Sequence, residues 1–263
     1  MKNRLRETYA QGVPCIGTFL QMGSPEAAEC AGLAGFDFFI VDMEHSPYDL
    51  PQITACCRAA EARGITPLAR ISQITRGTVL KALDAGAKGL IVPGIQTVEE
   101  VLQLIEYGKY TPIGNRGFCP TRCCGWGYDG SMAQGIGAYL AQCNRDTMLI
   151  PQCETVGCLK HLEEIVALEG VDGIFIGPFD LSVALGKPGQ FADEEVKQAF
   201  ARVLAVCRKA GKPVYIFAPD TAAGQLRLAQ GFDGICCSAD LNFMADAMLD
   251  AAKTLRGAKE ETK

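Results

Sequence analysis

Acidic residues follow two neighbouring apolar runs of the chain. Glu154 comes just after the run 148–152, and Asp180 comes just after the next run, 173–176. If both runs are strands of one parallel sheet, the two carboxylates converge over adjacent strand ends. Two carboxylates, completed by substrate oxygens and water, suit Mg²⁺ or Mn²⁺. The alternative is that both acids only interact with the amino ends of the helices that follow them.

A histidine lies at the end of another apolar run, beside two acids. The run 38–42 ends in Asp42, and Glu44 and His45 follow it directly. A histidine in this position can act as a general base near neutral pH, and either acid could orient its ring and raise its basicity. A buried, hydrogen-bonded histidine with only a structural role is the alternative.

Two further charged residues have positions that require a partner. Arg70 ends the apolar run 66–71, where a guanidinium needs an anion, either a protein carboxylate or a substrate carboxylate bound by two hydrogen bonds. Asp84 lies in the last turn of a helix that Gly86 is expected to end, where a negative charge opposes the helix dipole. We expect Asp84 either to be solvated or to have a cation nearby, such as a protonated histidine.

Two kinds of site are missing from the ends of the apolar runs. No lysine ends a run, so a Schiff-base mechanism lacks an obvious amine, and Lys187 is only a poor candidate. The turns after 213–217 and 234–237 lack the glycines of a barrel phosphate site, which disfavours a phosphorylated substrate.

The elements that must position these residues follow a repeated pattern. Short apolar runs alternate with amphipathic stretches, most of which begin with a capping residue or proline, and this order predicts a parallel sheet covered on both faces. Eight units in 263 residues, with no linker between them, favour a single domain of the α/β class, a (β/α)8 TIM barrel, over two doubly wound domains. The expected strands are 16–20, 38–42, 66–71, 89–93, 148–152, 173–176, 213–217 and 234–237.

One segment interrupts this pattern. Residues 108–146 are rich in glycine, cysteine and aromatic residues, and they contain Trp126, the only tryptophan. The segment is too long for a simple connection, so we expect an insertion at about 108–146 within a single barrel domain, 1–263. Because it follows a helix and precedes a strand, it should begin on the face opposite the catalytic end of its own barrel, and it could serve a neighbouring subunit.

Composition excludes several classes of protein. The formal net charge is −5 without a basic stripe, which argues against nucleic acid as a partner. Residues 1–12 lack the apolar stretch of a signal peptide and no window resembles a membrane span, so we expect a cytoplasmic protein with no membrane partner. The thirteen cysteines are odd in number and form no CxxC motif, which indicates reduced apolar fillers.

The expected strand ends and adjoining loops form an ordered set of motifs. They are Asp42-Met43-Glu44-His45-Ser46-Pro47, Ala69-Arg70, Leu83-Asp84-Ala85-Gly86-Ala87, Gly114-Asn115-Arg116-Gly117, Gln152-Cys153-Glu154 and Ile176-Gly177-Pro178-Phe179-Asp180-Leu181-Ser182. This set, which extends from about Gly12 to Met244, resembles the HpcH/HpaI aldolase/citrate lyase family. It looks closest to the class II, metal-dependent 2-oxo acid aldolases of that family.

The resemblance implies roles for the residues around a metal ion. Glu154 and Asp180 would hold Mg²⁺, Mn²⁺ or Co²⁺, with Asp180 also beside the substrate. Gln152 and the backbone at Phe179 would contact the 2-oxo acid, and Arg70 would stabilise its enolate. Phe179 often corresponds to a smaller residue in the family, so here it should narrow the opening beside the metal.

The resemblance also implies roles in proton transfer and assembly. His45 would transfer the proton, and an aspartate like Asp84, contributed across a subunit contact, would tune the basicity of the histidine together with Asp42 and Glu44. A site completed across an interface requires an oligomer, and the resemblance suggests a homo-hexamer built as a dimer of trimers.

The function expected on this basis is reversible aldol cleavage. The substrate would be a 4-hydroxy-2-oxo acid of the 2-dehydro-3-deoxy-glucarate or 4-hydroxy-2-oxo-heptanedioate type, and the products pyruvate and an aldehyde. Decarboxylation of an oxaloacetate-type diacid is an alternative, because it passes through the same enolate. A barrel without catalytic activity is a third possibility, and the intact set of polar strand ends argues against it.

Overall fold

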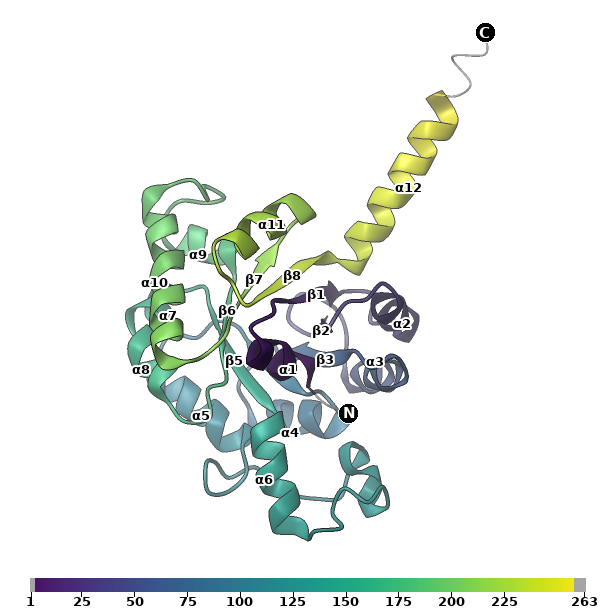
Figure 1. Cartoon of the computed structure of the whole chain (residues 1–263), viewed down its shortest axis with the longest axis vertical. Coiled ribbons are helices and arrows are strands. Elements are labelled where there is room, and N and C mark those ends of the chain that lie inside the picture. The colour runs from purple at the N-terminus through teal and green to yellow at the C-terminus, as the bar shows by residue number, and fades with distance from the viewer. Residues whose placement is uncertain (1–2, 258–263) are drawn as a thin grey trace.

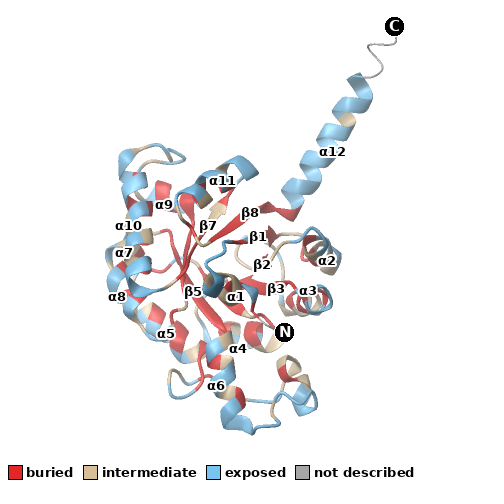
Figure 2. Ribbon diagram, in the orientation of Figure 1, coloured by how far each residue is buried: buried red, intermediate tan, exposed pale blue. Residues whose placement is uncertain are grey.

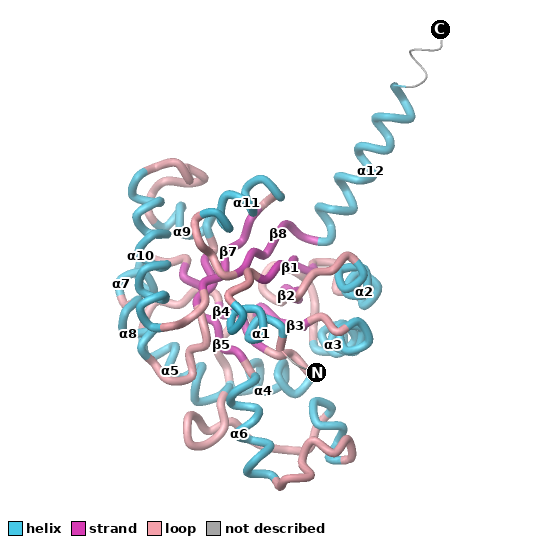
Figure 3. The backbone as a smooth tube through the Cα atoms, viewed as in Figure 1, coloured by secondary structure: helices cyan, strands magenta, loops and turns pink. Residues whose placement is uncertain are grey.

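The chain folds into a closed barrel of eight strands, as the sequence predicts. A computed structural model describes residues 3–257 and pairs every strand in parallel with its neighbours in chain order, β8 closing against β1 (Figures 1 and 3). Each strand begins and ends within two residues of the expected run. The strands are β1 (Cys15–Leu20), β2 (Phe38–Asp42), β3 (Thr66–Arg70), β4 (Gly89–Val92), β5 (Met148–Cys153), β6 (Ile174–Ile176), β7 (Val214–Ala218) and β8 (Gly234–Ala239).

Helices surround most of the barrel. Several begin at the residues that the sequence marks as caps: Thr97 and Glu100 form a capping box, and the Asp220 carboxylate accepts from the amide of Ala223 at 2.7 Å. The helices are α1 (Arg4–Gln11), α2 (Pro25–Leu33), α3 (Leu50–Arg63), α4 (Arg76–Ala85), α5 (Val98–Gly108), α6 (Ile136–Asp146), α7 (Val156–Lys160), α8 (Leu162–Ala167), α9 (Pro178–Ala184), α10 (Glu194–Ala210), α11 (Thr221–Ala229) and α12 (Asp240–Gly257), with a short 3-10 helix η1 (Arg122–Gly127).

The strands bury side chains on both faces, which explains why they read as continuous apolar runs. In β2, Phe38 and Ile40 point into the barrel, whereas Phe39 and Val41 pack beneath the surrounding helices. Leu5 of α1 joins the inner cluster and is 1% exposed. The thirteen cysteines, all within the described residues, are free, and nine of them are buried.

The insertion carries η1 and α6 and extends from one side of the barrel (Figure 1). It starts where α5 ends and leads back into β5. Lys109, its second residue, lies beside Thr147 and Asp172, which precede β5 and β6. The insertion therefore begins and ends at the amino end of the barrel, opposite the end where the polar strand-end residues lie.

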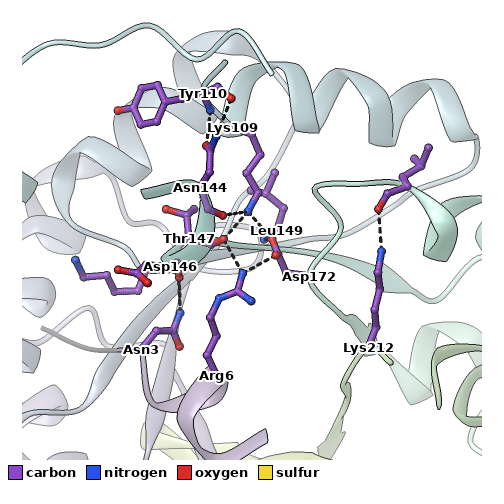
Figure 4. A network of polar contacts seen from close by, with 12 residues as sticks. Asn3, Arg6, Lys109, Tyr110, Asn144, Asp146, Thr147, Leu149, Asp172 and Lys212 are labelled. Atoms are coloured by element: carbon purple, nitrogen blue, oxygen red, sulfur yellow. Dashed lines mark hydrogen bonds and ion pairs between the residues drawn. The ribbon is translucent and has the colours of Figure 1, made fainter. Parts of the chain in front are cut away.

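A buried polar network closes this amino end (Figure 4). The Lys109 side chain is 1% exposed, and its ammonium lies 2.8 Å from Asp172 Oδ2 and donates to the carbonyls of Asn144 and Thr147 at 2.9 and 2.6 Å. Burial lowers the pKa of Lys109, and the Asp172 charge opposes that effect. Arg6 of α1 adds a second cation, 2.5 Å from Asp172 Oδ1.

Helix α12 leaves the barrel and projects away from it (Figures 1 and 2). Of its described residues only Asp240 is buried. The helix follows β8 and would be expected to cover the outer face of β8 and β1, yet Ile16 of β1 is 42% exposed. None of the helices in residues 3–257 has the length and hydropathy needed to span a bilayer.

Breaking the amino-end network should destabilise the protein strongly. We expect Asp172→Asn to lower the free energy of unfolding by about 3–5 kcal/mol, because it leaves the Lys109 ammonium buried without its counter-charge. Glu163→Gln is a matched control, since Glu163 pairs with Arg202 through side chains that are 56% and 40% exposed, and we expect a change of about 0–1 kcal/mol. Urea unfolding of both variants measures the difference, and equal values would contradict the prediction.

Candidate active site

A cavity of about 390 Å³ opens at the carboxyl end of the barrel. Its floor is aromatic, with the rings of Phe19 and Phe175 in edge-to-face contact at 6.2 Å. Catalytic sites of such barrels lie at this end, where loops after several strands meet. The lining residues are Phe19, Gln21, His45, Arg70, Gln152, Phe175, Gly177, Pro178, Phe179, Asp180, Phe217, Pro219, Ser238, Ala239 and Asn242.

A buried ion pair joins the ends of β2 and β3. Asp42 and Arg70 lie directly opposite each other in the strand register. Arg70 Nε donates to Asp42 Oδ1 at 2.9 Å and Arg70 Nη2 to Oδ2 at 2.7 Å. Of the two partners that the sequence left open for Arg70, the structure therefore supplies the protein carboxylate. The guanidinium also lies over the Phe19 ring, 4.6 Å from its centroid.

Each partner of the pair stabilises the ionised form of the other. Burial alone would raise the pKa of Asp42, but the hydrogen bonds and charge of Arg70, with the amides of His45 and Glu44, lower it instead. Burial alone would lower the pKa of Arg70, and Asp42 raises it above its ordinary value. Both groups are thus ionised, and Arg70 presents a fixed positive charge to the cavity.

Glu44 connects this pair to His45. Its Oε2 lies 3.2 Å from Arg70 Nη1 and 3.7 Å from His45 Nε2. Burial raises the pKa of Glu44, and the charge of Arg70 partly offsets this effect. Asp42 contacts the backbone amide of His45 at 3.3 Å rather than the ring, so Glu44 is the acid beside the imidazole. The His45 side chain is 64% exposed at the edge of the cavity.

Glu154 adjoins the cavity behind the lining residues Gln152 and Gly177. The residue is 8% exposed, and its Oε1 accepts from the amide of Gly94 at 2.7 Å. Burial raises the pKa of Glu154, and the negative charges of Asp180 and Glu44 raise it further, while the hydrogen bonds from Gly94 and Gln152 lower it. Three carboxylates thus share one electrostatic environment.

Gln152 is a buried amide with one unused oxygen. Its Nε2 donates to Glu154 Oε2, whereas its Oε1 has no hydrogen-bond partner within residues 3–257. A buried acceptor without a partner is costly and rare in folded proteins. Since Gln152 lines the cavity, its free oxygen indicates a place for a bound donor or cation.

These residues fit a divalent cation. Glu154 and Asp180 would supply oxygen ligands, and positive charge would relieve the repulsion by which Asp180 raises the pKa of Glu154. Gly177 leaves the space open, because a Cβ there would lie 2.5 Å from Glu154 Oε2 and 2.9 Å from Gln152 Nε2. No group of three or more His, Cys, Asp or Glu side chains in the described chain is placed to hold a metal ion. A cation held by Glu154 and Asp180 would therefore need further ligands from substrate and water.

Phe179 forms part of the cavity wall, next to Asp180 in the first turn of α9. Its ring makes edge-to-face contact with Phe191 at 5.0 Å and lies 6.1 Å from Phe217. The residue is 43% exposed. A large aromatic side chain therefore borders the opening beside the two carboxylates, as the sequence predicts.

Asp84 lies outside the cavity of its own chain. Its Oδ1 accepts from Arg116 Nη2 at 2.7 Å, and the Arg116 guanidinium stacks 4.8 Å from the Tyr110 ring centroid. The cation expected beside Asp84 is present, but it is an arginine of the insertion and not a histidine. The Arg116 side chain is 4% exposed and fixed by stacking, so it offsets the unfavourable helix dipole permanently.

Several lining residues had no assigned role from the sequence. Gln21 follows β1, and its Nε2 donates to Asp42 Oδ2 at 3.3 Å. Ser238 and Asn242 reach the cavity from β8 and the start of α12. Ser238 follows the last expected strand, and the sequence marks it as a polar strand-end residue without giving it a role; Gln21 follows the first expected strand, and the same rule applied there finds it.

Comparisons with known proteins identify the family and the fold. The family profile described as HpcH/HpaI aldolase/citrate lyase matches residues 15–247. The chain is 34% identical to a hydroxypyruvate/pyruvate aldolase of Rhizorhabdus wittichii, with 95% of each chain covered, and 30% identical to a 2-keto-3-deoxy-L-rhamnonate aldolase of Salmonella gallinarum, with 94% and 91% covered. Among solved structures, a HpcH/HpaI aldolase/citrate lyase family protein from Burkholderia cenocepacia J2315 has a TM-score of 0.88 and 32% identity, with 97% of this chain and 100% of that chain covered.

Filling the space at Gly177 should weaken cation binding. We expect Gly177→Ala to reduce Mn²⁺ affinity by about 10- to 100-fold, because the new methyl group displaces Glu154 and Gln152. Gly137→Ala is the control, since a Cβ at Gly137 on α6 has no atom within 4 Å. Calorimetric titration of both variants with Mn²⁺ measures the effect. Unchanged affinity in Gly177→Ala would show that these two side chains do not bind the cation.

Proposed function

The chain belongs to the HpcH/HpaI aldolase/citrate lyase family, and from this premise we propose that it is a metal-dependent aldolase. It reversibly cleaves a 4-hydroxy-2-oxo acid to pyruvate and an aldehyde. One observation carries the proposal: Arg70 and Asp180, from two different strand ends, line the same small cavity, and Glu154, from a third, adjoins it through its hydrogen bond with the lining residue Gln152. No lysine of the described chain lines that cavity, so the residues present support enolate chemistry without a Schiff base.

The family is generally dependent on a divalent metal ion. Glu154 and Asp180 would hold Mg²⁺, Mn²⁺ or Co²⁺, and such an ion, when bound, supplies a Lewis acid for the 2-oxo acid. The unused Gln152 oxygen and the space above Gly177 support this assignment.

Residues of the chain transfer the proton and stabilise the negative charge that develops during the cleavage. His45 accepts the proton of the C4 hydroxyl through a water molecule as the C3–C4 bond breaks, with the Glu44 carboxylate 3.7 Å from its ring. The bonding electrons pass to the C2 oxygen and form the enolate of pyruvate. Arg70 stabilises the negative charge of this enolate, and Asp42 fixes the plane of the guanidinium. The protonated His45 returns this proton, through water, to C3 of the enolate, which gives pyruvate and restores the neutral histidine.

Substrate binding uses the polar wall between β5 and α9. Gln152 contacts the 2-oxo acid, and the backbone of Phe179 at the start of α9 contacts its carboxylate. The Phe179 ring narrows the opening on that side and limits the size of the aldehyde half. The substrate is therefore a small, unphosphorylated 2-oxo acid.

The active form is a homo-oligomer, a hexamer built as a dimer of trimers. Asp84 is too remote from its own cavity to line it, and in the assembly it approaches His45 of a neighbouring chain. Helix α12 supports self-association, because it extends away from its own barrel and is almost wholly exposed (Figure 2), and its sequence carries an apolar stripe. The stripe follows a heptad-like spacing of three and four residues: Leu241, Met244, Met248, Ala251 and Leu255. A second copy covers this stripe.

Loss of the Glu154 charge should abolish metal-dependent turnover. We expect Glu154→Gln to lower kcat/KM for pyruvate release from a 4-hydroxy-2-oxo acid by about 100-fold or more, because the cation loses a charged ligand. EDTA should inhibit the wild-type enzyme to a similar extent, and Glu163→Gln on the surface should leave the activity unchanged. If Glu154→Gln released pyruvate at the wild-type rate with EDTA present, the assignment of the metal site would fall.

The same assay identifies the reaction. Pyruvate is offered with a panel of aldehydes, including succinic semialdehyde, tartronate semialdehyde and glycolaldehyde, with Mg²⁺, Mn²⁺ or Co²⁺. Carbon–carbon bond formation supports the aldolase. Pyruvate formation from oxaloacetate alone, with no aldol product from any pair, would show a decarboxylase instead.

A charge in the apolar stripe of α12 should disrupt the assembly. We expect light scattering after size exclusion to give a multiple of 28.1 kDa for the wild type and a smaller assembly for Met248→Glu, because burying an unpaired carboxylate opposes association. Lys253→Glu changes a charge on the opposite side of the same helix and serves as the control. A wild-type enzyme that is active at about one chain mass would contradict the oligomeric site.

A further inference from the structure

An extra residue in β8 distorts the strand where it meets the cavity. Gly17 of β1 pairs with Cys236 and Phe19 pairs with Ala239, so two steps along β1 correspond to three steps along β8. This is a β-bulge, and such bulges redirect side chains beside active sites. Ser238 lies within it, with a φ of 55°.

The backbone of Ser238 has a conformation that favours glycine. Within residues 3–257, only Trp126 and Ser238 combine a side chain with positive φ, and Trp126 is 62% exposed in the insertion. Ser238 is 5% exposed, in a strand of the barrel itself. A side chain in a strained, buried position next to a catalytic cavity requires a compensating role.

The hydroxyl of Ser238 is available to a ligand. The Ser238 carbonyl accepts from Thr18 Oγ1 at 3.3 Å, which holds the bulge, but the hydroxyl has no hydrogen-bond partner among the described residues. The other polar side chains on this side differ, because Gln21 is engaged by Asp42 and Asn242 is exposed at the rim. On this side of the cavity, Ser238 is therefore the buried polar group that remains free to act, whereas the free oxygen of Gln152 lies beside Glu154.

The order of the strands separates Ser238 from the carboxylates. Strand β8 is separated from β6 by β7, and from β5 by β6 and β7. The same cavity extends from Asp180 to Phe217, Ser238 and Ala239, so a substrate held at Glu154 and Asp180 by its 2-oxo acid end has room for its other carbons there. Phe217 and Ala239 are apolar, so a hydroxyl in that region has few partners in the wall.

We propose that Ser238 determines specificity, its hydroxyl forming a hydrogen bond with a hydroxyl group of the substrate. This inference rests on the proposed function. The substrate hydroxyl is either the one on C3 of the 2-oxo acid donor or the one on the carbon next to the aldehyde carbonyl of the acceptor. Removal of the Ser238 hydroxyl then lowers selectivity for hydroxylated substrates without removing the chemistry.

Two substitutions separate this role from a structural one. Ser238→Ala removes the hydroxyl and keeps the strained backbone with a side chain, whereas Ser238→Gly removes the hydroxyl and relieves the strain. We expect both variants to lose about 3- to 10-fold of the preference for hydroxylated over unhydroxylated substrates. Only Ser238→Gly should gain thermal stability, by about 2–4 °C in apparent Tm. Ser131→Ala, in the insertion, is the control and should change neither property.

The assay pairs pyruvate or hydroxypyruvate with acetaldehyde or glycolaldehyde and measures kcat/KM for all four pairs. If kcat/KM falls mainly for the pairs that contain hydroxypyruvate, Ser238 contacts the C3 hydroxyl of the donor. If it falls mainly for the pairs that contain glycolaldehyde, Ser238 contacts the hydroxyl of the aldehyde. Either result supports the proposal. Equal changes for all four pairs in Ser238→Ala would overturn it.

A binding measurement separates this proposal from the proposed function. Calorimetry with Mg²⁺ present compares the affinity of each variant for hydroxypyruvate and pyruvate. A wild-type protein that forms no aldol product but binds hydroxypyruvate through Ser238 would retain the inference and refute the aldolase. If the wild type is an active aldolase, and the Ser238 variants keep its affinities for hydroxypyruvate and pyruvate and its relative kcat/KM values for the four pairs, the proposed function stands and the inference is refuted.

Discussion

The catalytic end of the barrel depends on one buried ion pair, formed by Asp42 and Arg70. Two charges removed from water are costly unless their geometry and remaining hydrogen bonds are good, and here two parallel hydrogen bonds and two backbone amides meet that requirement. The pair is possible because neighbouring parallel strands place the two residues opposite each other. It orients the guanidinium toward Glu44 and the cavity, and it supplies the cationic side of a site whose other wall is acidic.

Much of the fold could be predicted from the sequence. A parallel barrel buries both faces of its strands, so each strand is a continuous run of apolar residues in the sequence. The eight runs, the capping box at Thr97 and the position of the insertion all followed from local pattern. The direction of α12, which leaves its own barrel, could not be predicted from the local sequence pattern. An amphipathic helix has the same pattern whether its apolar face covers its own barrel or another chain, so the sequence could not distinguish these arrangements.

The candidate site was predictable to the extent that it depends on strand ends. Glu154, Asp180, His45 and Arg70 were found in this way, and the structure brings them to one cavity or its border. Which anion Arg70 contacts was not predictable, because that contact depends on strand register. The partner of Asp84 was not predictable either, because it is Arg116, 32 residues further along the chain. The conformation of Ser238 depends on a bulge between β8 and β1, the two ends of the sheet in sequence.

The buried polar network at the amino end of the barrel determines the order in which parts of the chain can pack during synthesis. Helix α1 leaves the ribosome before every strand of the barrel, yet Arg6 bonds to Asp172, 166 residues later, and Asn3 bonds to the carbonyl of Asp146. Helix α1 therefore cannot complete its contacts with the barrel until the chain has emerged beyond Asp172, and Leu5 cannot join the inner cluster before then. Closure of the barrel is consequently a late step, completed only when β8 reaches β1.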